Sequence, residues 1–177
     1  MHFIIDSSPR EDGNGNWIAD RLAEKYPDSE RLKLSKMTYS GCKACGSCRK
    51  NNSFCIQNDD LGKYLSRFAE ANGLILVAPN YMGFINGTAK SMLDRFYCMR
   101  TAEKMSRFKE GTKFAFLLTQ GSHNRDKGSA AVDWMKRFAE NYQLKYLGLT
   151  VPGCNNDNLD GIKLKKEDIL MNFSFFF

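Results

Sequence analysis

Two continuous apolar runs, at residues 74–78 and 114–118, constrain the fold of this chain more than any other feature. Neither run alternates apolar with polar residues, so neither suits a strand that has one face in water. Strands that are apolar on both faces are typical of the middle of a parallel sheet, where helices cover both sides. The sequence therefore predicts an α/β fold built on a buried parallel sheet.

Shorter runs at residues 3–6, 31–34 and 146–151 complete a set of five candidate strands. Between the runs, apolar residues recur at intervals of three and four over residues 17–26, 61–69, 92–99 and 131–142, which predicts amphipathic helices. Strands separated by helices need crossover connections, and right-handed crossovers produce a three-layer, doubly wound sheet. Ligands of such sheets bind beyond the carboxyl ends of the strands, so the loops after the first, third and fourth strands are the candidate site.

The length of 177 residues, 42% of them hydrophobic, suits one core, so we expect a single domain over residues 1–177. No apolar stretch approaches the roughly 20 residues that cross a bilayer. The first residues read as a strand rather than a secretory signal, so we expect a cytoplasmic location and no membrane partner. The net charge of +6 is dispersed, and we expect no nucleic-acid partner. Residues 155–177 end in an aromatic tail and have room for a shortened final helix.

The loop at residues 7–16 joins the first strand to a helix and is rich in hydroxyl, amide and glycine residues. A helix N-terminus offers backbone N–H groups and a partial positive charge to an anion. The residues suited to a terminal phosphate there are Ser8, Arg10, Asn14, Gly15 and Asn16. The same composition also suits an ordinary turn and helix cap.

Residues 7–10, Ser-Ser-Pro-Arg, followed by Gly13 and Asn14, resemble the first loop of the NAD(P)H-dependent FMN reductase and iron-sulfur flavoprotein superfamily. The resemblance implies a flavodoxin-like fold with strand order 2-1-3-4-5 and FMN as cofactor. It also implies that Ser8, Arg10, Asn14 and Asn16 contact the FMN phosphate. Gly15 stands where the family usually has a hydroxyl residue.

The loop at residues 79–87 resembles the second flavin motif of the same family, a proline and tyrosine followed by small residues and a helix ending in Asp-Arg. The resemblance implies that this loop flanks the isoalloxazine ring. Loop amides and a soft or aromatic side chain suit a flat apolar ring with a polar edge. The residues concerned are Pro79, Asn80, Tyr81, Met82 and Gly83.

A third loop, at residues 119–124, follows the fourth predicted strand. Gly121 would let the backbone approach the flavin edge or a nicotinamide. His123 is a candidate hydrogen-bond donor or proton source, although a single loop histidine is more often a surface residue.

Four cysteines, Cys42, Cys45, Cys48 and Cys55, follow a C-x2-C-x2-C-x6-C spacing in a loop at residues 41–58. Thiolates at this density suit an iron-sulfur cluster or zinc, and spacing alone does not choose between them. The motif resembles that of the iron-sulfur flavoproteins, which implies a [4Fe-4S] cluster near the flavin. Reduced thiols that shape an acceptor site or a subunit contact are the alternative.

These features predict an FMN-dependent oxidoreductase that moves electrons from NAD(P)H to a quinone, a free flavin, another small electrophile or a protein acceptor. The flavin carries the chemistry. A flavodoxin-like electron carrier without catalytic activity is the first alternative, and a zinc-stapled binding domain is the second. The family resemblance implies a homodimer or a dimer of dimers.

Overall fold

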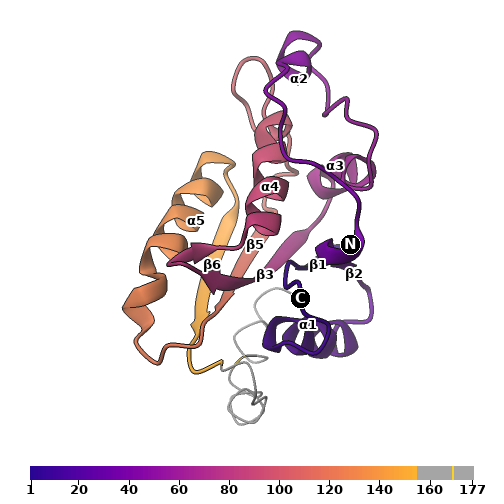
Figure 1. Cartoon of the computed structure of the whole chain (residues 1–177). Helices are drawn as coiled ribbons and strands as arrows, with labels where there is room; N and C mark the ends of the chain where they lie inside the picture. Colours follow the sequence, from indigo (N-terminus) through magenta and orange to yellow (C-terminus); the bar gives the residue numbers. More distant parts are fainter. Residues whose placement is uncertain (155–168, 170–177) are drawn as a thin grey trace.

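The computed structural model describes residues 1–154 and Ile169. Five parallel strands form the sheet: β1 (His2–Asp6), β2 (Ser29–Lys33), β3 (Gly73–Tyr81), β5 (Lys113–Thr119) and β6 (Lys145–Val151). They pair in the order β2-β1-β3-β5-β6 (Figure 1). The predicted order 2-1-3-4-5 is thus confirmed. The short strand β4 (Phe84–Ile85), which was not predicted, pairs antiparallel with the end of β3.

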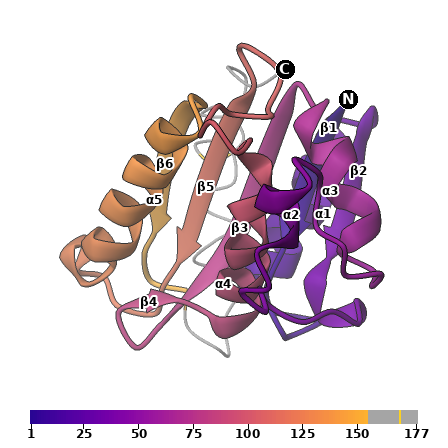
Figure 2. The same cartoon turned by 90° about the horizontal axis from the view of Figure 1, so that it is seen from above.

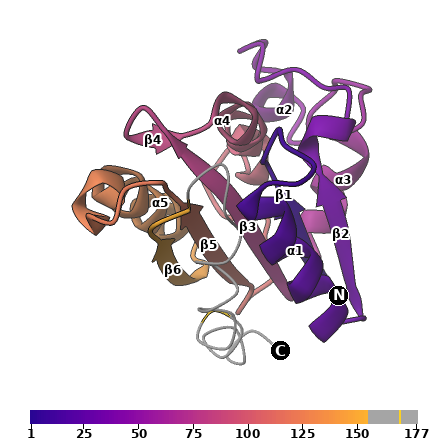
Figure 3. The ribbon, with the colours of Figure 1, turned by 60° about the horizontal axis from the view of Figure 1, so that its bottom comes forward.

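Helices cover both faces of this sheet, which confirms the three-layer architecture (Figure 3). Helices α3 (Gly62–Ala69), α4 (Gly87–Arg95) and α5 (Ser129–Asn141) pack on one face, and α1 (Asn14–Lys25) packs on the other. The short helix α2 (Ser47–Lys50) lies inside the cysteine loop. Single 3-10 turns, η1 (Leu34–Lys36), η2 (Phe96–Met99) and η3 (Arg125–Gly128), complete the described elements.

The central strand β3 explains why the run at residues 74–78 is apolar throughout. Leu74 and Leu76 pack with α3, α4 and α5, whereas Ile75 and Val77 pack with α1. All four side chains are fully buried, and each contributes about 1.5–3 kcal/mol of hydrophobic stabilisation. The loop that follows β3 is therefore anchored to a fully buried segment of the sheet.

The turn between β3 and β4 places Met82 and Gly83 at positive φ, 53° and 81°. Two successive residues with positive φ are typical of tight hairpins whose twist matches that of the flanking strands. The hairpin reaches toward helix α5, where the ring of Phe84 lies 5.6 Å from that of Trp134 (Figure 2). This contact holds the end of β3 against the helical layer.

No helix within residues 1–154 has the length and apolarity to span a bilayer. The predicted final helix and aromatic tail fall in residues 155–177, which, apart from Ile169, lie outside the described residues. Ile169 itself is buried in the apolar cluster on the α1 side of the sheet.

Candidate functional site

A cleft of about 280 Å³ opens where β1, β3 and β5 end. Its position agrees with the rule that open parallel sheets bind ligands beyond the carboxyl ends of their strands. The three loops that the sequence singled out all contribute to it. The lining residues are Ser8, Arg10, Gly13, Asn14, Gly15, Pro79, Asn80, Tyr81, Thr119, Gln120, Gly121 and Cys154.

One end of the cleft is the start of helix α1. The helix follows Gly13, whose extended backbone begins the helix without a side-chain cap. A Cβ atom at Gly15 would lie 3.3 Å from the Cβ of Ser8 and 3.5 Å from a methyl of Val77, so the loop packs closely on the sheet. The partial positive charge of the helix start, with Ser8 and Arg10 beside it, fits a terminal phosphate group.

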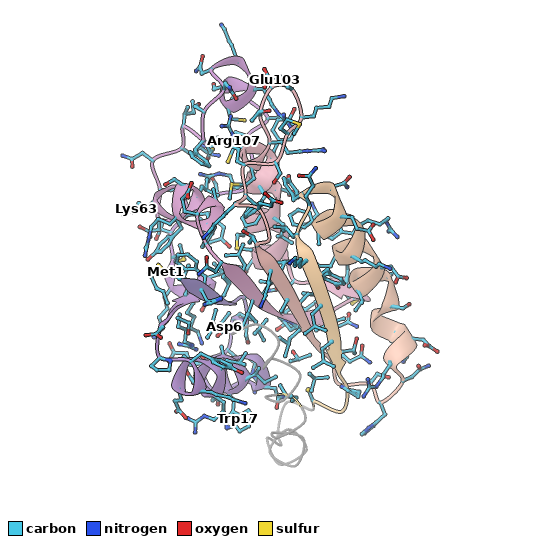
Figure 4. The ribbon with its side chains drawn as sticks, turned by 180° about the vertical axis from the view of Figure 1, so that it is seen from behind. Met1, Asp6, Trp17, Lys63, Glu103 and Arg107 are labelled. Atoms are coloured by element: carbon cyan, nitrogen blue, oxygen red, sulfur yellow. The ribbon has the colours of Figure 1, made fainter. Side chains whose placement is uncertain are left out.

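A buried ion pair between Asp6 of β1 and Lys33 of β2 contacts the backbone of this loop. Asp6, at the end of β1, has no exposed surface, and one of its carboxylate oxygens accepts a hydrogen bond of 2.8 Å from the backbone N–H of Ser8. The Nζ of Lys33 lies 3.6 Å from the other carboxylate oxygen and donates to the carbonyl oxygen of Arg10 over 2.9 Å. In Figure 4, Asp6 lies between the sheet and helix α1, which carries Trp17. The pair ties β1, β2 and the loop into one unit.

Burial raises the pKa of Asp6, and the Ser8 N–H, Lys33 and Arg31 oppose that shift. Arg31 contributes from 3.5 Å, and Asn16 bridges the group by accepting hydrogen bonds from both Arg31 and Lys33. The carboxylate is thus held by two cations on β2. A buried carboxylate without a compensating charge is costly, and Lys33 and Arg31 supply that charge here.

Amide side chains connect the two loops at the other end of the cleft. The side-chain N–H of Asn80 donates to the Oε1 of Gln120 and to the carbonyl oxygen of Lys127, each over 3.2 Å. Gln120 in turn donates to the carbonyl oxygen of Asn124 over 2.7 Å. Tyr81 stands at the mouth with 47% of its surface exposed, so its ring is available for stacking on a flat aromatic ligand.

The cleft brings together eight of the predicted flavin residues: Ser8, Arg10, Asn14, Gly15, Pro79, Asn80, Tyr81 and Gly121. The other three do not line it. Asn16 turns away toward Arg31, Lys33 and Asp20, and Met82 and Gly83 form the tip of the hairpin. The His123 ring lies against Gly153, where an added Cβ would come within 2.7 Å of it.

Four lining residues were not among the predicted flavin contacts: Thr119, Gln120, Cys154 and Gly13. The first two directly precede Gly121 at the end of a predicted strand, so strand-end position was the available signal. Cys154 carried no such signal. It reaches the cleft because its backbone N–H donates to the carbonyl oxygen of Gln120 over 2.9 Å.

A second pocket, of about 320 Å³, is lined by all four cysteines of the predicted motif. Cys42 and Cys45 are exposed, and Cys48 and Cys55 are half-buried. Buried Cys98 joins them from η2, which the sequence spacing did not indicate. Within the part of the chain that the structure describes, no three Cys, His, Asp or Glu side chains are arranged as a metal site. The pocket therefore has the donor set for a thiolate-bound group, although its thiols do not converge on one metal position among the described residues.

The thiols of this pocket differ in acidity. Hydrogen bonds from the backbone and side chain of Ser47 lower the pKa of Cys45, whereas burial raises the pKa of Cys48. Burial also raises the pKa of Cys98, to about 11. Burial by itself lowers the pKa of Arg95, but hydrogen bonds to Asp59 and the Coulombic attraction of Cys55 and Asp59 outweigh it and raise that pKa. Cys55 thus lies beside a permanent positive charge.

The fold and the cleft define the class of this protein as flavodoxin-like α/β, with a cleft lined by three loops at the carboxyl edge of a parallel sheet. The chain belongs to the NADPH-dependent FMN reductase family, whose model matches residues 2–148. Family membership supports FMN binding and an oxidoreductase function.

Two curated relatives are iron-sulfur flavoproteins. That of Methanosarcina thermophila is 30% identical over 138 residues, covering 74% of this chain and 70% of the relative. That of Archaeoglobus fulgidus is 29% identical over 115 residues, covering 65% of this chain and 55% of the relative.

Solved structures with the same fold include an NAD(P)H:quinone oxidoreductase from Methanothermobacter marburgensis, with a TM-score of 0.74 at 14% identity over 96% of this chain and 95% of that one. An FMN-dependent NADH-azoreductase from Bacillus anthracis in complex with FMN gives a TM-score of 0.73 at 14% identity over 98% of this chain and 97% of that one. At these identities the two structures show the fold alone.

Proposed function

We propose that this protein transfers electrons from NAD(P)H through FMN to a small acceptor such as a quinone, a free flavin or another electrophile. The observation that carries the proposal is the cleft in which the helix start at Gly13, the amide-linked loops and the Tyr81 ring converge. The names of the structural neighbours, a quinone oxidoreductase and an azoreductase, support a small acceptor.

Different residues of the cleft would bind the phosphate and the ring of FMN. Ser8, Arg10 and the first amides of α1 would hold the phosphate, and Asn80 and Tyr81 would face the ring. Bound FMN would supply the chemistry, namely acceptance of a hydride from a nicotinamide and onward electron transfer. The protein orients the ring and leaves the mouth beside Tyr81 open to the second substrate. No general acid or base is required of the chain for this role.

For the cysteine pocket we propose a [4Fe-4S] cluster ligated by Cys42, Cys45, Cys48 and Cys55. The names of the curated relatives and the four thiols lining one pocket support this. Soft thiolate ligands in this number suit iron-sulfur clusters. Binding would require the loop to rearrange, because its thiols do not converge on one metal position in the described part of the chain.

The decisive experiment is anaerobic purification followed by an absorption spectrum and assays of iron, acid-labile sulfide and zinc. We expect bound FMN that NADH or NADPH bleaches and a quinone reoxidises. A protein that holds FMN but is not reduced by either nucleotide would be an electron carrier instead. A colourless, zinc-containing protein that never retains added FMN would contradict the proposal.

We also propose that the protein is a homodimer or a dimer of dimers and is cytoplasmic. The exposed hairpin tip at Met82, which stands next to Tyr81 at the cleft mouth, supports a subunit contact there. Light scattering after size exclusion, for the wild type and Met82→Lys, tests the first point. Monomeric wild-type protein at micromolar concentration would contradict it.

A further inference from the structure

Arg95, the last residue of helix α4, is the largest fully buried side chain in the described part of the chain. A charged side chain is almost never fully buried unless other groups compensate its charge and its hydrogen-bond donors. Arg95 belongs to the Asp-Arg pair that ends this helix, and the motif by itself does not explain the burial. Its contacts do.

The guanidinium of Arg95 reaches both ends of the cysteine loop. One terminal nitrogen, Nη1, donates to the carbonyl oxygen of Ser40 over 2.9 Å and to Asp59 over 2.7 Å. The other, Nη2, donates to the carbonyl oxygen of Gln57 over 3.5 Å and to Asp59 over 3.3 Å. Ser40 and Gln57 flank the segment that contains all four cysteines of the motif. A single planar group thus closes that segment at its base.

Two further hydrogen bonds complete the closure. The side-chain N–H of Gln57 donates to the carbonyl oxygen of Gly41 over 3.2 Å, and the Ser40 hydroxyl donates to the Oε1 of Gln57 over 2.9 Å. Ser40 and Gln57 lie at the protein surface, whereas Arg95 does not. The buried guanidinium is therefore the part of the closure that water competes with least.

The third nitrogen of the guanidinium, Nε, is buried and has no hydrogen-bond partner among the described residues. Arg95 also lines the cysteine pocket. The pocket's other cation, Lys43, is exposed to solvent and so is largely screened. A buried cation with a spare N–H donor in a pocket of thiols favours an anionic occupant, because charge-assisted hydrogen bonds are the strong ones.

We propose that Arg95 is the positioning residue of the cysteine site, which closes the loop at both ends before any group binds and offers its Nε–H to the anionic thiolate-bound group. The second half of the inference rests on the proposed cluster, and the first half does not. Toward a cluster, this positive charge would favour the reduced, more negative state.

The test compares Arg95→Met, Arg95→Lys and the double variant Asp59→Asn/Arg95→Met, which removes both charges of the pair. Asp94→Asn is the matched control, because Asp94 is the neighbouring residue and is half-exposed, paired with Lys90. FMN affinity and far-ultraviolet circular dichroism report whether each variant folds. Trypsin cleaves after Lys43, Arg49 and Lys50. The cleavage rate in cluster-free protein, followed by mass spectrometry, measures how readily the cysteine loop opens.

We expect Arg95→Met to be cleaved in the loop about tenfold faster than the wild type while FMN affinity is unchanged. After anaerobic reconstitution it should retain less than half of the wild-type iron and sulfide and show a lower reduction potential. Arg95→Lys should restore the potential in part, since it keeps the charge, but less of the protease protection, since one ammonium cannot reach both loop ends.

Arg95→Met with wild-type cleavage rates and iron content would overturn the proposal. Loss of FMN binding and fold in all three variants would also overturn it, because Arg95 would then stabilise the whole domain. Wild-type protein that takes up no iron or sulfide would contradict the proposed cluster and the Nε interaction with it. The cleavage rates alone would then decide whether Arg95 closes the loop.

Discussion

Replacing Lys33 with methionine tests how the proposed phosphate-binding loop, residues 7–16, is held. The Lys33 side chain is only 7% exposed. The change to methionine keeps most of its apolar stem and removes the ammonium group. It deletes the hydrogen bonds to the carbonyl oxygen of Arg10 and to Asn16 and leaves the buried carboxylate of Asp6 with one fewer cation. Breaking a buried ion pair costs about 3–5 kcal/mol. Because Arg31 remains 3.5 Å from the same carboxylate oxygen, we expect a loss toward the lower end of that range.

Two measurements check this expectation. Urea unfolding of the flavin-free protein gives the loss of stability. Titrations with FMN and with riboflavin, which lacks the phosphate, separate loop geometry from ring binding. Since Lys33 holds the loop through the Arg10 carbonyl, we expect FMN affinity to fall about tenfold, a loss typical of one hydrogen bond to a charged group, and riboflavin affinity to stay unchanged.

Lys36→Met is the matched control. Lys36 also contacts this loop, through an ion pair of 3.0 Å with Glu11, but its side chain is 66% exposed. Solvent screens an exposed pair, so it contributes little to stability and this variant should behave like the wild type. The reasoning is refuted if Lys33→Met is as stable as the control and binds FMN equally well. An equal loss of FMN and riboflavin affinity would show that Lys33 acts on the whole cleft rather than on the loop.

Three other substitutions test other parts of the structure. Arg10→Ala should weaken FMN binding by about tenfold but not riboflavin binding, as measured by flavin fluorescence, because only FMN carries the anion. Gly128→Ala would place a methyl group 2.6 Å from a methyl of buried Leu118 and 2.7 Å from the Oε1 of Gln120, so we expect a loss of about 1–3 kcal/mol in urea unfolding, and wild-type stability would contradict that packing. Burial by itself raises the pKa of Asp59, but hydrogen bonds, chiefly from Arg95, lower it below the ordinary 3.8. Ionised Asp59 therefore stabilises the fold above pH 3.8, and this contribution is lost as the pH falls through the lower folded pKa. The stability difference between wild type and Asp59→Asn should be constant near neutral pH and shrink below pH 4. A difference independent of pH would refute the stabilising role of ionised Asp59.

The sequence by itself determined the fold class and the location of the cleft. The runs at residues 74–78 and 114–118 can be apolar throughout only if helices cover both faces of their strands, as the structure has them. In a parallel sheet all strands end at one edge, so the loops after them must meet there. The positions of Ser8, Asn80 and Gly121 after three predicted strands were therefore enough to predict that they line one cleft, as they do.

Only the tertiary structure decided which side chains support the site. In the parallel register, Asp6 of β1 lies beside Lys33 of β2, and this pairing turns Asn16 toward the two strands rather than into the cleft. Arg95 of α4 and Cys98 of η2 meet the cysteine loop from about forty residues further along the chain. A local pattern predicts the direction of a side chain within its own helix or strand. Which buried charge lies next to which is set by the packing of distant segments, because a buried ionic group must find its partner wherever the fold places one.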